Sequence, residues 1–78
     1  MKPRNRSKML KRLGENLRYE RIRANLTQAE LAAKIGAQHV RISELERGLE
    51  NPTLERLIDL SKALGVELSR LTQTCDTN

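Results

Sequence analysis

The stretch LTQAELAAKIGAQHVRISELERG, residues 26–48, decides the fold because it holds two short helical periods joined by a glycine. Near its start, Thr27 is followed three residues later by Glu30, the capping-box pattern that begins a helix. After Gly36 a second apolar period places Ile42 and Leu45 on one side. Two short helices joined by a glycine-containing turn cross at a wide angle. The stretch therefore predicts two crossing helices, the second of which covers residues 38–47 and projects from the domain.

This arrangement makes demands on individual positions. Ala32 is expected to be small because the two helices approach closely there. Gly36 is expected to take a positive φ, which a side chain would make costly. Ile35 has to be apolar to hold the crossing angle, whereas the outer face of the second helix has to be polar. The sequence meets each demand.

The flanking sequence is helical as well. Before the central stretch, apolar residues at intervals of three and four predict a helix from Met9 to about Ala24, with Asn25 as its left-handed cap. The expected inward residues are Leu10, Leu13, Leu17 and Ile22. After Pro52, with Asn51 or Thr53 as cap, a fourth helix ends at Gly65. Its expected apolar face comprises Leu54, Leu57, Ile58, Leu60 and Leu64.

The last apolar residues, Val66, Leu68 and Leu71, predict one more short helix. Because Val66 and Leu68 alternate, a short strand that pairs two copies of the chain stays an alternative. The organisation expected is a flexible basic arm over residues 1–8, one domain over 9–72 and a polar tail over 73–78. Few β-branched and aromatic residues favour an all-α fold.

Charge is distributed unevenly along the chain. The formal net charge is +5, and residues 1–25 hold nine Lys and Arg against two Glu. A basic N-terminal segment suits a polyanion such as nucleic acid or an anionic membrane, although a solvated tail is the simpler alternative.

Composition argues against other classes of protein. One His and one Cys, with no glycine-rich phosphate loop, offer neither a catalytic constellation nor a structural metal site, so we expect no enzyme and no cofactor. No apolar run reaches the length of a membrane span, and the single Cys75 fits a reducing cytoplasm.

Together with NPTLERLIDLSKALGVELSRL at residues 51–71, the central stretch resembles the XRE/Cro/C1-type helix-turn-helix family, which includes phage repressors and restriction–modification controller proteins. The resemblance covers about residues 13–71. It implies a five-helix, lambda-repressor-like domain, usually a homodimer, that binds palindromic operators in double-stranded DNA. It also implies a salt bridge between Arg21 and Glu46, and a phosphate contact by Gln28.

The family's groove-facing positions are matched here by Gln38, His39, Val40, Ser43 and Glu44, and Arg47 matches a position near the backbone. Their chemistry agrees, because His39 can donate to guanine, Glu44 can accept from cytosine and Val40 can touch a thymine methyl. Arg41 and Arg47 would contact phosphates, unless either pairs with Glu44 at helical spacing.

These features predict a cytoplasmic, sequence-specific transcriptional regulator. An antitoxin that also binds a partner toxin is the alternative, since the family includes such proteins. A basic amphipathic membrane binder is a third interpretation, which we do not favour because the other helices bury their apolar faces against one another.

Overall fold

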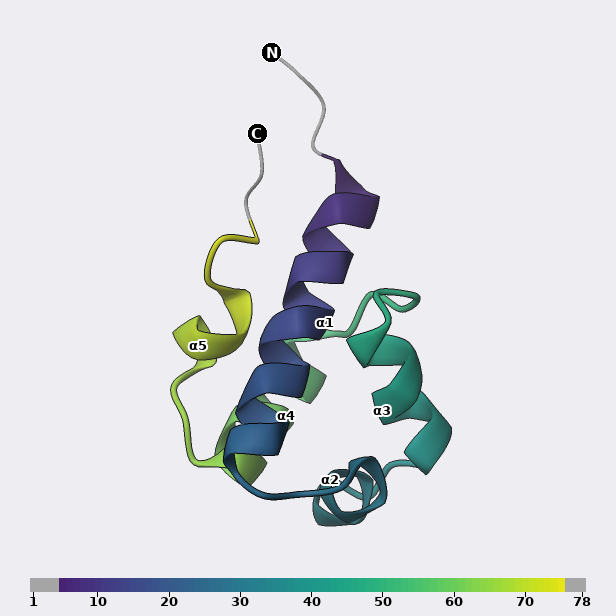
Figure 1. Ribbon diagram of the computed structural model, residues 1–78, viewed down its shortest axis with the longest axis vertical. Helices are drawn as coiled ribbons and strands as arrows, with labels where there is room; N and C mark the ends of the chain where they lie inside the picture. Colours follow the sequence, from purple (N-terminus) through teal and green to yellow (C-terminus); the bar gives the residue numbers. More distant parts are fainter. Residues whose placement is uncertain (1–4, 76–78) are drawn as a thin grey trace.

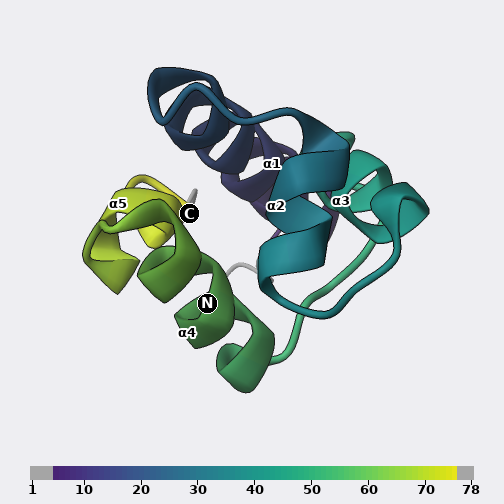
Figure 2. The ribbon, with the colours of Figure 1, turned by 90° about the horizontal axis from the view of Figure 1, so that it is seen from below.

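The structure is a computed structural model that describes residues 5–75 of the chain. Within that range it is all-helical, and Figure 1 shows the helices in order along the chain. They are α1 (Arg6–Arg23), α2 (Gln28–Lys34), α3 (His39–Glu46), α4 (Leu54–Leu64) and α5 (Leu68–Thr72). Figures 1 and 2 place α2 and α3 on one side of the molecule and α5 on the other, with α1 running between them. The predicted five-helix fold is confirmed.

Local signals set most helix boundaries where they were expected. The Thr27 hydroxyl accepts from the Glu30 amide at 3.0 Å and the Glu30 carboxylate accepts from the Thr27 amide at 2.8 Å, which completes the capping box. Thr53 caps α4 through the amide of Arg56 at 3.1 Å. Asn25 has a φ of 63°, as predicted for a left-handed cap.

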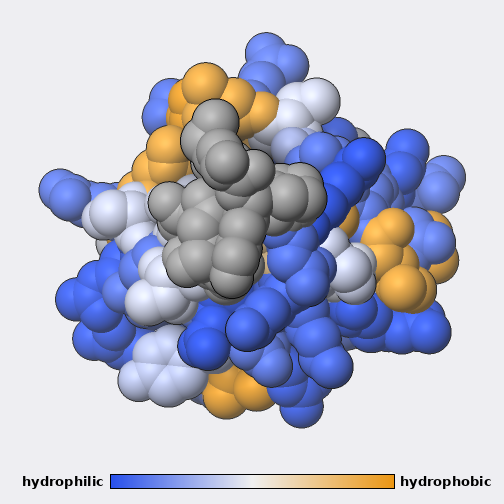
Figure 3. Space-filling view, turned by 90° about the horizontal axis from the view of Figure 1, so that it is seen from above, coloured by the Kyte–Doolittle hydropathy of each residue, from blue (hydrophilic) through white to orange (hydrophobic). Residues whose placement is uncertain are grey.

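The core collects apolar residues from every helix. Leu31, Ile42, Leu60 and Leu71 are its largest fully buried side chains, and they come from α2, α3, α4 and α5. Leu10, Leu13 and Leu17 of α1 complete the cluster. Seen along α1 from its N-terminal end, the surface is mostly hydrophilic and its apolar side chains form separate small groups (Figure 3). Most of the large apolar side chains in the core cluster therefore pack between the five helices and hold them together.

Two glycines set the distance between α1 and the end of α3. A Cβ on Gly14 would lie 2.5 Å from the carbonyl oxygens of both Leu45 and Glu46. Gly48 has a φ of 75°, and a Cβ there would lie 2.8 Å from the Cα of Lys11. Only glycine permits so close an approach of backbones. The role of Gly14 was not predicted.

Three expectations about apolar positions were wrong. Ile22 is exposed because the buried side of α1 continues from Leu17 to Glu20 and Arg21, so position 22 lies outside it. Leu54 and Ile58 are exposed because α4 faces the core with other residues, chiefly Leu60 and Leu64. The apolar stripes are therefore narrower than the sequence suggested.

The N-terminal boundary was also wrong. The first helix begins at Arg6 rather than at Met9, because the Asn5 side chain accepts from the amide of Lys8 at 3.0 Å and caps it. Residues 6–8, expected in a flexible arm, are helical, while residues 1–4 of that arm lie outside the described part.

The C-terminal segment is a helix, so the strand alternative was wrong. Leu71 is fully buried, and the Asn16 side chain donates from Nδ2 to the carbonyls of Leu71 and Gln73, each at 2.9 Å. Cys75 packs against the core, where burial raises the pKa of its thiol. Residues 73–75 are therefore anchored on α1 rather than free in a polar tail, and residues 76–78 lie outside the described part.

Across residues 5–75, no helix combines the length and the apolar character needed to cross a membrane. Within the same range, His, Cys, Asp and Glu side chains form no group suited to a metal ion.

Candidate nucleic-acid interface

The outer face of α3 carries most of the predicted site. His39, Val40, Arg41 and Arg47 are exposed, as is Gln38, which precedes the helix. Ser43 and Glu44 are half-buried. On the inner face, Ile42 and Leu45 pack into the core as predicted. The helix therefore presents a mainly polar surface, with Val40 as its exposed apolar residue, along the side of the molecule, where Figure 1 shows α3 at its edge.

Glu46 anchors the inner side of α3 to α1. Arg21 donates from Nε to Glu46 Oε2 at 2.5 Å and from Nη2 to Oε1 at 3.1 Å. Both side chains are buried, with exposed fractions of 10% and 3%. The remaining guanidinium nitrogen of Arg21 donates to the Leu26 carbonyl at 2.7 Å. The predicted salt bridge is present, and its paired hydrogen bonds fix the orientation of α3 against α1.

Gln28 extends this network to the recognition face. Its Nε2 donates to Glu46 Oε1 at 3.0 Å, and its Oε1 lies 3.0 Å from Nε2 of His39. Because the amide nitrogen of Gln28 faces a carboxylate, the atom that faces His39 is an oxygen. The Nε2 of His39 therefore carries a hydrogen and donates it. A chain of hydrogen bonds thus runs from α1 to the first turn of α3.

This chain limits what the two side chains can offer a ligand. The second amide hydrogen of Gln28 stays available for an acceptor. The neutral His39 ring, with hydrogen on Nε2, presents Nδ1 as an acceptor rather than a donor. The sequence alone did not predict this link, because it depends on how closely the start of α2 approaches the start of α3.

Arg41 and Glu44 of α3 do not form the ion pair that their helical spacing allowed. Arg41 donates from Nη1 to Glu50 Oε1 at 2.6 Å, in an exposed pair with the loop that follows α3. Within residues 5–75, Glu44 forms no ion pair with Arg41 or Arg47. The alternative in which Glu44 is occupied by its helical neighbours was therefore wrong.

The start of α3 lacks a side-chain cap. Gln38 is the N-cap residue, and its side chain makes no capping hydrogen bond. The first amides of α3 are consequently free of the partner that a Ser or Thr would supply.

Comparison with known proteins shows which family has this arrangement of helices. A family model described as Helix-turn-helix (HTH_3) matches residues 17–71, more than half of the chain. The uncharacterized HTH-type transcriptional regulator y4dJ of Sinorhizobium fredii (strain NBRC 101917 / NGR234) is 40% identical over 68 residues, which cover 87% of this chain and 88% of that protein. Two other curated relatives are longer, and the matches span 38% of one and 28% of the other.

Solved structures agree. The restriction–modification controller protein C.AhdI from Aeromonas hydrophila superposes with a TM-score of 0.77 at 32% identity, over 80% of this chain and 94% of that one. The P22 c2 repressor in complex with a synthetic operator superposes with a TM-score of 0.73 at 36% identity, over 78% and 92% of the two chains. From its sequence, its fold and the geometry of α2 and α3, the chain belongs to the helix-turn-helix family of transcriptional regulators.

Proposed function

We propose that the chain regulates transcription by binding double-stranded DNA as a cytoplasmic homodimer, with α3 in the major groove of each half-site. The observation that carries the proposal is the polar outer face of α3, held on its inner side by the buried Arg21–Glu46 pair. A major groove admits one α-helix, and a rigid helix presents its side chains at fixed positions to the base edges. The similarity to a repressor solved with its operator supports the same placement.

Base recognition is assigned to His39, Val40 and Ser43, with Gln38 and Glu44 beside them. With its Nε2 held by Gln28, the neutral His39 ring offers Nδ1 to the amino group of cytosine or adenine. This differs from the donation to guanine expected from sequence, for which Nε2 of His39 would have to leave Gln28. Val40, exposed on the first turn, suits a thymine methyl.

Phosphate contacts are assigned to Gln28, Arg41 and Arg47. Gln28 would use its second amide hydrogen and keep its bonds to Glu46 and His39. Arg41 bonds Glu50 through Nη1 alone, so its other guanidinium donors can reach a phosphate while that pair stays in place. Such contacts position the protein on DNA and carry the dependence of affinity on salt.

The homodimer follows from the size of the contact. One recognition helix covers only a few base pairs, and a second copy doubles the site. Two-fold symmetry then requires a palindromic operator with half-sites about 10 base pairs apart, centre to centre.

The test is in vitro selection of bound DNA from a random pool, with sedimentation to give the mass of the complex. We expect one palindromic motif for the native chain and a changed preference at one position per half-site for His39→Ala. Each good base contact discriminates by about 1–3 kcal/mol, which corresponds to roughly 5- to 150-fold. Ser69→Ala, on the exposed side of α5, is the matched control and should leave the motif unchanged. Selection of no motif, or binding by a strict monomer, would contradict the proposal.

A further inference from the structure

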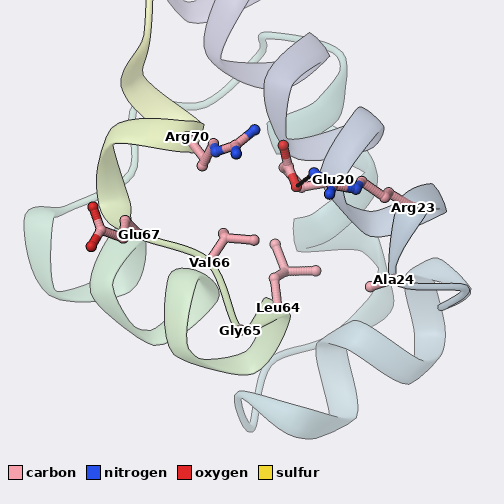
Figure 4. A pocket seen from close by; sticks show the side chains of 8 residues that line it. All are labelled: Glu20, Arg23, Ala24, Leu64, Gly65, Val66, Glu67 and Arg70. Atoms are coloured by element: carbon pink, nitrogen blue, oxygen red, sulfur yellow. Dashed lines mark ion pairs between the residues drawn. The ribbon is translucent and has the colours of Figure 1, made fainter.

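A pocket lies on the side of α1 away from the recognition helix. It has a volume of about 440 Å³ and opens between the end of α1, the end of α4 and α5. Figure 4 shows its lining: Glu20, Arg23, Ala24, Leu64, Gly65, Val66, Glu67 and Arg70. None of these residues belongs to α2 or α3. The pocket is therefore separate from the proposed DNA interface, and an inference about it does not depend on that proposal.

Glu20 is the unusual residue of this pocket. Its side chain is 2% exposed, yet no hydrogen-bond donor among residues 5–75 reaches its carboxylate. Its one ion pair in that range, with Nη1 of Arg23, spans 3.8 Å, which is beyond hydrogen-bond distance. Glu46, buried to a similar extent, receives hydrogen bonds from Arg21 and Gln28. A buried carboxylate without donors is costly, because the long ion pair with Arg23 does not replace the hydrogen bonds that water would supply.

The other charges in the pocket are cationic and more accessible. Arg23 is more than half exposed, and Figure 4 shows Arg70 extending from α5 toward Glu20. Arg70 nevertheless forms no ion pair with Glu20 in the described structure. The Glu67 carboxylate points away from Glu20 in the same view. The pocket thus presents one buried anion beside two cations, with Leu64 and Val66 as its apolar wall.

We infer that this pocket binds a free α-amino acid. The ammonium group donates to the Glu20 carboxylate, and the α-carboxylate accepts from the guanidinium groups of Arg23 and Arg70 on the open side of the pocket. The amino-acid side chain packs on Leu64 and Val66. A simple cation would be repelled by the two arginines and a simple anion by Glu20, whereas a zwitterion satisfies both and forms charge-assisted hydrogen bonds at each end.

The test is calorimetric titration of the full chain with each of the twenty standard L-amino acids in turn. At least one is expected to bind with a Kd of about 1 mM or lower. Its N-acetyl derivative, which lacks the ammonium group, and its decarboxylated amine, which lacks the carboxylate, should each bind at least about 10-fold more weakly. Failure of all twenty to bind at millimolar concentration would overturn the inference.

Variants locate the site. Glu20→Gln keeps the shape of the side chain and removes its charge, so it should weaken binding at least about 10-fold, and Arg70→Gln should do likewise. Glu55→Gln, an exposed change in the first turn of α4, is the matched control and should leave the Kd unchanged. Because Arg70 is exposed, its variant carries the test even where Glu20→Gln alters folding. Unchanged binding by both pocket variants would overturn the inference.

Discussion

The buried Arg21–Glu46 pair allows a sharp test of how α3 is held in place. Glu46→Leu removes the acceptor of two hydrogen bonds from Arg21 and one from Gln28. The guanidinium of Arg21 then keeps only the Leu26 carbonyl at 2.7 Å, although it is only 10% exposed. Loss of one member of a buried ion pair costs about 3–5 kcal/mol, because the other charge stays buried without compensation.

The reverse change should be milder. In Arg21→Met, the Glu46 carboxylate keeps the hydrogen bond from Gln28 at 3.0 Å and an ion pair with Arg18 at 3.9 Å. We therefore expect a loss near the lower limit of that range, about 3 kcal/mol. The double variant leaves no buried charge without a partner, and only two neutral groups, the Leu26 carbonyl and the Gln28 amide, lose a hydrogen-bond partner. It should be destabilised by about 2–3 kcal/mol, far less than the two single losses combined.

The assay is urea denaturation of the four proteins, followed by circular dichroism at the helical band. A domain of this size has a free energy of unfolding of about 4–12 kcal/mol, so Glu46→Gln serves as a gentler substitute where Glu46→Leu is unfolded in water. A coupling of at least about 2 kcal/mol between the two positions is expected, with unchanged m values. If the two losses instead add to within about 0.5 kcal/mol, the pair does not hold α3 as we describe.

Three further predictions follow from contacts elsewhere. Gly14→Ala should lower the free energy of unfolding by about 1–3 kcal/mol in the same assay, because its Cβ would strike the carbonyl of Leu45; higher stability, as helix propensity alone predicts, would contradict this. The Thr27 amide, and after it the Thr27 hydroxyl, hold the pKa of Glu30 below its ordinary value. The stability that these hydrogen bonds supply is therefore present above the pKa of Glu30 in the unfolded chain, and it is lost as the pH falls through the pKa of Glu30 in the folded protein. Thr27→Ala should raise the Glu30 pKa in a carbon-13 titration, and an unchanged pKa would refute the assignment. Burial raises the pKa of Cys75, so iodoacetamide should modify this thiol more slowly in the folded protein than in the urea-unfolded one. Asn16→Ala should remove part of that protection, because it releases the C-terminal segment from α1.

Apart from the Arg21–Glu46 salt bridge, which the family resemblance implied, most local details predicted correctly from sequence depend on near neighbours. The Thr27–Glu30 capping box, the left-handed Asn25 and the positive φ of Gly36 each arise from interactions within a few residues. The cap at Asn5 belongs to the same class and was missed, although an asparagine before a helix is a recognised signal. The alternating basic residues around it were taken as evidence of an arm.

The features predicted wrongly, or not at all, depend on which elements meet in space. Ile22 and Ile58 have apolar side chains, but among residues 5–75 no helix packs over them and both stay exposed. Gly14 matters only because the carbonyls of α3 pass within reach of its Cα. The Arg41–Glu50 pair and the Gln28–His39 bond likewise join segments whose approach no local pattern specifies. The base and phosphate contacts assigned to α3 stay predictions until DNA is bound.

The two buried glutamates, Glu46 and Glu20, differ in whether their carboxylates receive hydrogen bonds. This difference distinguishes a structural role from a binding role. Arg21 and Glu20 are neighbours on α1 but point to different sides, since successive residues of a helix are about 100° apart. On one side Arg21 meets Glu46, and each available oxygen of that carboxylate has a donor. On the other side Glu20 lines a pocket with no donor in contact, although a leucine at that position would pack without such a cost. Glu20→Leu should therefore raise the midpoint of thermal unfolding while it abolishes amino-acid binding. A merely structural glutamate would show the opposite, a loss of stability with nothing bound to lose.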